Sequence, residues 1–129
     1  LPENANFNGT KILLVDDDIE FFKLIGVWLS QNGFDAAHAQ NAREFYQKAF
    51  AFHPDLIILD IMLGSENGTE AYNQLLRDGF DSNIPVIFLS SLAETGEESE
   101  AGTGRKYSLH KKPFDRGKLL KEINCLTSN

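Results

Sequence analysis

Three short apolar runs stand out along the chain, and each has the length and composition of a strand that is buried on both faces. They are KILLV at 11–15, DLIILD at 55–60 and PVIFLS at 85–90. Two weaker segments of similar length, FDAAHA at 34–39 and YSLHKK at 107–112, contain more polar residues. The pattern predicts five strands.

Helical periodicity occupies most of the intervals between these strands. The interval 19–34 predicts an amphipathic helix that stops at Gly33, because its bulky apolar residues fall within half of a helical wheel. These residues are Phe21, Phe22, Leu24, Ile25, Trp28 and Leu29. The interval 41–52 predicts a helix with Asn41 as its N-cap and Glu44 at the spacing of a capping box.

Two further helices are predicted over 69–79 and 115–126, so strands and helices alternate. Alternation of this kind implies parallel strands joined by right-handed crossovers, which is a doubly wound α/β sheet with five strands. The interval 93–105 breaks the rule, because it holds three glycines and four glutamates and has almost no apolar face. It predicts a weak or short fourth helix.

Composition places this sheet in a single domain. The chain has 129 residues with a net charge of −7, which disfavours direct binding to nucleic acid or anionic lipid. No apolar run approaches the roughly 20 residues of a membrane-spanning helix. The only cysteine, Cys125, fits a reducing, cytoplasmic compartment and is expected to pack as a small residue. We interpret residues 1–9 as a flexible leader and 10–127 as the domain.

Polar side chains follow four of the predicted strands at the edge where such sheets bind ligands. Asp16 and Asp17 follow the first strand, Asp60 ends the third, Ser90 ends the fourth and Lys112 ends the fifth. Three carboxylates that converge repel one another, and a divalent cation would remove that repulsion. Hard oxygen ligands favour Mg²⁺, which takes one or two carboxylates together with substrate phosphate.

The addition of a hydroxyl and an ammonium group to this edge suggests a phosphoryl site. A phosphoryl group in transfer spreads negative charge over its oxygens, and a metal ion, Lys112 and Ser90 would stabilise that charge. A carboxylate is a competent nucleophile for the reaction. Asp60 is the best candidate, because it lies between the acidic pair and the basic end in strand order.

Four segments together resemble the successive motifs of response-regulator receiver domains, the phosphoacceptor modules of two-component signalling. They are ILLVDDD, DLIILDIMLGSENG, PVIFLSS and KKPF, and the resemblance extends over residues 11–126. It implies a flavodoxin-like sheet with strand order 2-1-3-4-5. It also implies that Asp60 accepts a phosphoryl group from the phosphohistidine of a histidine kinase in the presence of Mg²⁺.

The resemblance implies a role for each motif residue. Asp17 would bind Mg²⁺ directly with the assistance of Asp16, and the backbone carbonyl of Met62 would be a further ligand. Ser90 would hydrogen-bond a phosphoryl oxygen, and Lys112 would pair with the phosphate.

Gly68 fits the loop glycine that follows the acceptor strand in the family. Two positions depart from the family pattern. Gly64 stands where proline is usual, and Leu109 stands where the family has its switch aromatic residue. Tyr107 lies two residues earlier.

The expected phosphoryl donor is a sensor histidine kinase or a phosphotransfer protein. The phosphorylated domain is expected to act on an output domain or a downstream protein, or to form a phosphorylation-dependent dimer. The chain is expected to be a phosphoacceptor and not a turnover enzyme. Two alternatives remain open: a degenerate receiver that only binds partners, and a Mg²⁺-dependent phosphatase of the haloacid dehalogenase type. The phosphatase is disfavoured because that family needs an aspartate two residues after the nucleophile, where this chain has Met62.

None of His38, His53 and His110 has a second histidine at ligand spacing, so structural or surface roles are expected.

Overall fold

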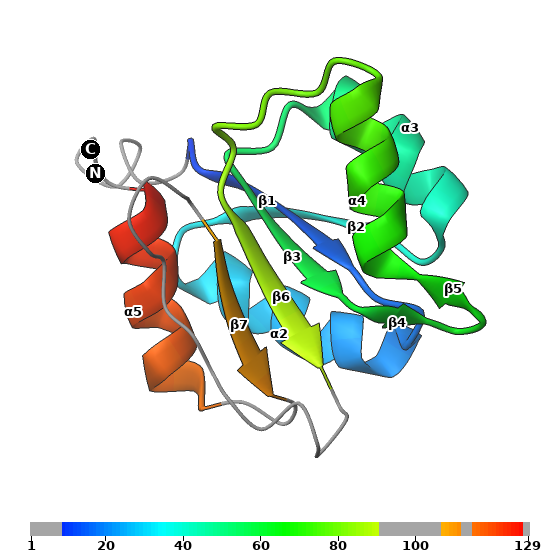
Figure 1. The fold of residues 1–129 in the computed structure, drawn as a ribbon. Helices are drawn as coiled ribbons and strands as arrows, with labels where there is room; N and C mark the ends of the chain where they lie inside the picture. The colour runs from blue at the N-terminus through cyan, green and yellow to red at the C-terminus, as the bar shows by residue number, and fades with distance from the viewer. Residues whose placement is uncertain (1–8, 91–106, 112–114, 128–129) are drawn as a thin grey trace.

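The computed structural model describes residues 9–90, 107–111 and 115–127, and for 107–111 it describes the backbone. Figure 1 shows one sheet with helices on both of its faces. The strands are β1 (Lys11–Val15), β2 (Asp35–Ala39), β3 (Leu56–Asp60), β4 (Met62–Leu63), β5 (Glu66–Asn67), β6 (Val86–Ser90) and β7 (Tyr107–Lys111). The helices are α2 (Ile19–Gln31), α3 (Ala42–Phe52), α4 (Gly68–Arg77) and α5 (Arg116–Thr127).

Five of the strands form a single parallel sheet in the order β2-β1-β3-β6-β7. Counted along the chain, these strands follow the order 2-1-3-4-5, so the expected flavodoxin-like architecture is confirmed. Because all five strands run in the same direction, their carboxyl ends meet at one edge. In Figure 1 this is the edge marked by the arrowheads.

Side chains that alternate along the strands build two separate cores. Ile12 and Leu14 of β1 face a core that α2 and α5 cover, whereas Leu13 and Val15 face a core that α3 and α4 cover. β1 and β3 are almost completely buried, as their continuous apolar runs predicted. The central strands are therefore rigid supports for whatever lies at their carboxyl ends.

Local sequence signals set the ends of the helices. Asn41 caps α3, since its side chain accepts the backbone N–H of Glu44. The Glu44 carboxylate accepts the N–H of Gln40, whereas a standard capping box uses the N–H of the N-cap residue itself. The predicted capping box therefore forms with a partner one residue earlier. Gly33 follows α2 with φ = +87°, a left-handed conformation that glycine adopts without strain.

Two predictions about burial are wrong. Leu24 was assigned to the apolar face of its helix, but its side chain is 56% exposed, because the sheet covers a narrower arc of α2 than half a wheel. Cys125 was expected to pack, but it lies on the exposed side of α5. The predicted fourth helix at 93–105 and the side chain of Leu109 lie outside the described residues. Among the described helices, none has the length and hydropathy needed to cross a membrane.

Candidate functional site

Three aspartates meet where β1 and β3 end. A carboxylate oxygen from each of Asp16, Asp17 and Asp60 lies within 4.8 Å of the others. The parallel pairing of Val15 with Leu59 brings them together, because it aligns the ends of the two strands. Asp16 and Asp60 are buried and Asp17 is exposed, so the cluster opens to solvent on one side.

Asp16 is held through its backbone and its side chain. Its N–H donates to the carbonyl of Ala39 at 3.0 Å, and its carboxylate accepts the N–H of Asp18 at 2.9 Å. Its own carbonyl lies 2.7 Å from Nε2 of His38. Sequence reasoning gave His38 only a structural or surface role, and no sequence pattern relates it to Asp16.

Asp18, the third consecutive aspartate, has a different task. Its carboxylate accepts the N–H groups of Glu20 and Phe21, which makes it the N-cap of α2. A carboxylate at this end also interacts favourably with the helix dipole. Asp18 therefore orders the start of the helix while its two predecessors face the cluster.

Asp60 is fixed by the chain that follows it. Its carboxylate accepts the N–H of Met62 at 3.0 Å, and the N–H of Ile61 donates to Leu89 on the neighbouring strand. Residues 62–67 fold into the β4-β5 hairpin, which Figure 1 shows beside the ends of β1 and β3. The carboxylate of Glu66 ties this hairpin to α3 by accepting the N–H of Ala42 at 2.9 Å.

Two glycines shape this hairpin and the helix after it. A Cβ atom on Gly68 would lie 2.2 Å from the backbone carbonyl oxygen of Asp60, so no other residue fits without movement. The N–H of Gly68 donates to Ile61 at 2.6 Å across this close approach. Gly64 has φ = +60°, which proline cannot adopt because its ring fixes φ near −65°. The glycine at position 64 therefore permits a backbone conformation that the proline usual in the family could not adopt.

The other two predicted site residues differ in how far the structure describes them. Ser90 is buried at the end of β6, and its neighbour Leu89 pairs with Asp60. Lys112 lies outside the described residues. The backbone of Lys111, which precedes it in the sequence, pairs with Ser90 at the same edge of the sheet.

The spacing of the three carboxylates fits one small, hard cation. Mg²⁺ binds oxygen at 2.0–2.1 Å, so ligands on opposite sides of the ion lie roughly 4.2 Å apart. The oxygens of Asp16, Asp17 and Asp60 are therefore within a small side-chain adjustment of enclosing such an ion. The exposed side of the cluster leaves room for water or a phosphoryl oxygen.

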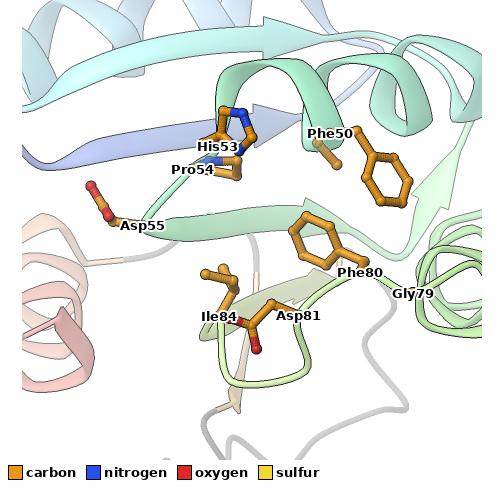
Figure 2. A pocket seen from close by; sticks show the side chains of 9 residues that line it. Phe50, His53, Pro54, Asp55, Gly79, Phe80, Asp81 and Ile84 are labelled. Carbon is orange, nitrogen blue, oxygen red and sulfur yellow. The ribbon is translucent and has the colours of Figure 1, made fainter.

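A cavity of about 290 Å³ lies at the opposite end of the sheet, before β3 and β6 begin (Figure 2). Phe50, His53, Phe80 and Ile84 are among its walls, and Asp55 and Asp81 contribute carboxylates. Each of these two carboxylates accepts a backbone N–H, from Lys11 and Asn83 respectively. Their hydrogen bonds serve the local chain path, so the acidic edge remains the stronger candidate site.

Comparison with known proteins identifies the family of this chain. The sequence matches the profile of the response regulator receiver domain over residues 12–124. It is 37% identical to the probable transcriptional regulator ycf29 of Pyropia yezoensis, over 90% of this chain and 52% of that protein. It is 32% identical to protein PilH of Pseudomonas aeruginosa, over 90% of this chain and 96% of PilH.

A solved structure extends the comparison to the fold. The receiver domain of the Francisella response regulator 1452 is 25% identical, with a TM-score of 0.74 over 92% of this chain and 96% of that one. The chain spans about half the length of the transcriptional regulators it matches and almost all of PilH. The chain therefore belongs to the family of response regulator receiver domains.

Proposed function

We propose that this domain is a phosphorylation-switched signalling module that accepts a phosphoryl group on Asp60. The observation that carries the proposal is the meeting of three carboxylates, two of them buried, at the carboxyl ends of β1 and β3. A structural role does not account for three like charges in so small a space, since their repulsion destabilises the fold. A bound cation does account for it, and the same cation would attract the oxygens of an incoming phosphoryl group.

The proposed transfer needs only two reactants, the phosphohistidine of the donor and the carboxylate of Asp60. A carboxylate oxygen of Asp60 attacks the phosphorus of a phosphohistidine, the P–O bond forms, and the P–N bond to the donor imidazole breaks. Mg²⁺ bound by Asp16, Asp17, Asp60 and the Met62 carbonyl would neutralise charge on the phosphoryl oxygens. The N–H of Met62, already bonded to the carboxylate of Asp60, keeps that side chain in place.

Ser90 and Lys112 complete the proposed site. The Ser90 hydroxyl would donate to a phosphoryl oxygen, and the Lys112 ammonium would pair with the phosphate. The low exposure of Asp60 and Ser90 supports a protected phosphoryl group, because burial limits the access of water to the acyl phosphate.

The proposed partners follow from this chemistry. The donor would be a sensor histidine kinase or a phosphotransfer protein in the cytoplasm, and the phosphorylated domain would control an output domain, a partner or its own dimerisation. Several relatives are transcriptional regulators about twice this length. With a net charge of −7, this domain itself is not expected to contact DNA directly.

Mass spectrometry after treatment with acetyl phosphate and Mg²⁺ tests the proposal. The wild-type chain should gain one phosphoryl group, and the Asp60→Asn variant should gain none. Asp35→Asn is the matched control, because Asp35 is an exposed aspartate at the start of β2, and it should be labelled like the wild type. Equal labelling of Asp60→Asn and the wild type would contradict the assignment.

The same experiment separates the alternatives. Binding of Mg²⁺ without phosphoryl uptake by the wild type would favour a degenerate receiver that acts only through its partners. Continuous release of phosphate from small phosphate esters would favour a phosphatase.

A further inference from the structure

The last two residues of β2 hold Asp16 from two sides. The carbonyl of Ala39 accepts the N–H of Asp16 at 3.0 Å, and Nε2 of His38 lies 2.7 Å from the carbonyl of Asp16. A carbonyl oxygen can only accept, so Nε2 of His38 carries the hydrogen of this bond. The peptide group that leads out of Asp16 is therefore anchored to the neighbouring strand.

Two contacts fix the orientation of the His38 ring. It stacks on the ring of Phe22, with centroids 4.1 Å apart and planes inclined by 10°. Phe22 belongs to the first turns of α2, directly after the acidic segment, and its N–H bonds to the carbonyl of Asp18. The backbone of His38 is held as well, because its carbonyl accepts Nζ of Lys48. A half-buried ring held in this way has little freedom to turn from Asp16.

The anchored peptide group controls the position of Asp17. The carbonyl of Asp16 and the N–H of Asp17 belong to one planar unit, so fixing the carbonyl fixes the plane from which Asp17 continues. The Asp17 side chain is exposed, and its carboxylate must still lie within 4.8 Å of those of Asp16 and Asp60. Repulsion among the three groups favours rotation of Asp17 toward solvent, and the bond from His38 opposes rotation of its backbone.

We propose that His38 is a positioning residue for the metal site, which holds Asp17 in the cluster through its hydrogen bond to the Asp16 carbonyl. The inference rests on the proposed function, since it assumes that the cluster binds Mg²⁺. His38 touches neither the ion nor the phosphoryl group. It acts by keeping the ligands arranged before the cation arrives, which lowers the cost of binding.

Two substitutions separate the hydrogen bond from the ring. His38→Phe keeps a flat ring that can stack on Phe22 but has no N–H to donate. His38→Gln has no ring, but its side-chain amide can donate from nearly the same position. The measured quantity is the Mg²⁺ dissociation constant from calorimetric titration, together with labelling by acetyl phosphate at limiting and saturating Mg²⁺.

His38→Phe should bind Mg²⁺ about threefold to tenfold more weakly, which is the range expected for one lost hydrogen bond. Its labelling should slow at limiting Mg²⁺ and recover at saturating Mg²⁺. His38→Gln should stay within about twofold of the wild type. Leu126→Val is the stability control, because it removes one methylene group from a buried side chain of α5. It should lower Tm without changing the Mg²⁺ dissociation constant.

Each contrary result has a distinct meaning. If the wild type binds Mg²⁺ and is phosphorylated, and His38→Phe behaves identically, the inference about His38 is wrong and the proposed function stands. If His38→Gln is as weak as His38→Phe, or Leu126→Val weakens binding equally, the hydrogen bond is not the cause. A wild-type chain that neither binds Mg²⁺ nor takes up phosphate would overturn the proposed function and this inference together.

Discussion

At the scale of single residues, consecutive aspartates with the same charge have three different environments. Asp16 is buried and hydrogen-bonded through its N–H, its carbonyl and its carboxylate. Asp17 is exposed within the carboxylate cluster, and Asp18 caps α2. The charge of Asp18 is thus compensated by the helix, and the remaining repulsion is concentrated where the proposed cation would bind.

Gly68 is the residue whose replacement tests the packing behind Asp60 most directly. Gly68→Ala should lower the free energy of unfolding by about 2 kcal/mol or more, because its Cβ would collide with a backbone carbonyl that cannot move freely. Urea denaturation without Mg²⁺ measures the effect. Gly26→Ala is a matched control within α2, where the nearest atoms to the new Cβ belong to the Phe22 ring at 3.5 Å, an ordinary contact distance.

Gly26→Ala should be neutral or stabilise by about 0.5–1 kcal/mol, since alanine has the higher helix propensity. If Gly68→Ala were as well tolerated as Gly26→Ala, the close approach to Asp60 would not be a constraint on the fold.

At the scale of the elements, α3 and α4 are joined by a contact on the protein surface. The Tyr46 hydroxyl donates to the Asp78 carboxylate at 2.8 Å, and Gln74 donates to the same oxygen at 3.1 Å. The bond to Asp78 raises the pKa of Tyr46, and the bonds from Tyr46 and Gln74 lower the pKa of Asp78. Both shifts favour the neutral phenol beside the ionised carboxylate.

The pH dependence of stability follows from these directions. The contribution of Asp78 is present above its ordinary pKa of 3.8 and is lost as pH falls through its lowered value. The contribution of Tyr46 is present below its ordinary pKa of 10.0 and is lost as pH rises through its raised value. Tyr46→Phe should therefore lower Tm by at most a few degrees near neutral pH, since the pair is exposed.

The difference in Tm between Tyr46→Phe and the wild type should shrink below about pH 4 and above about pH 10. In acid the narrowing should report the Tyr46 bond alone, because Gln74 donates to Asp78 in both proteins and its contribution cancels in the difference. Thermal melts across this range measure it. A difference that stays constant at every pH would mean that the hydroxyl and the carboxylate do not interact.

At the scale of the whole molecule, one scaffold supports an edge at which three carboxylates gather. Two apolar cores hold β1 and β3 from both faces, so the ends of these strands cannot separate to relieve repulsion among Asp16, Asp17 and Asp60. Binding of a cation at this edge would therefore be coupled to the stability of the whole molecule. A ligand that binds only the folded state stabilises it in proportion to the logarithm of its concentration.

Mg²⁺ at about 100 times its dissociation constant should raise the free energy of unfolding by about 2.7 kcal/mol. Asp17→Asn should lose most of this increase, because it removes an anionic ligand. In the presence of a chelator the same variant should be more stable than the wild type, by on the order of 1 kcal/mol, because one repelling charge is gone. Denaturation with and without Mg²⁺ checks both effects.

Asp35→Asn again serves as the control, and it should respond to Mg²⁺ like the wild type. If Mg²⁺ left the unfolding of the wild type unchanged, the cluster would not be a metal site at millimolar concentrations of the ion.

Element type and order follow from local chemistry, which explains why the sequence predicts them well. A continuous apolar run such as KILLV can be buried only between two layers, and Asn41 with Glu44 can satisfy the first N–H groups of a helix. The errors arise where burial depends on distant parts of the chain. The helical pattern placed Leu24 and Cys125 in the interior, but both side chains are exposed. Which face of a helix is buried depends on how the helix packs against the sheet, and the local pattern does not contain that information.

By itself the sequence determined the alternation of strands and helices and the identity of the polar residues that follow each strand. These features depend on short-range periodicity and capping, which a linear chain contains in full. Only the tertiary structure decided that the carboxylates of Asp16, Asp17 and Asp60 lie close enough to bind one ion. It also decided that the N–H of Met62 bonds to the Asp60 carboxylate and that His38 bonds to the Asp16 carbonyl. Gly68 has no room for a side chain for the same reason. Those contacts depend on the register of β1 with β2 and β3 and on the path of the hairpin, which long-range packing fixes.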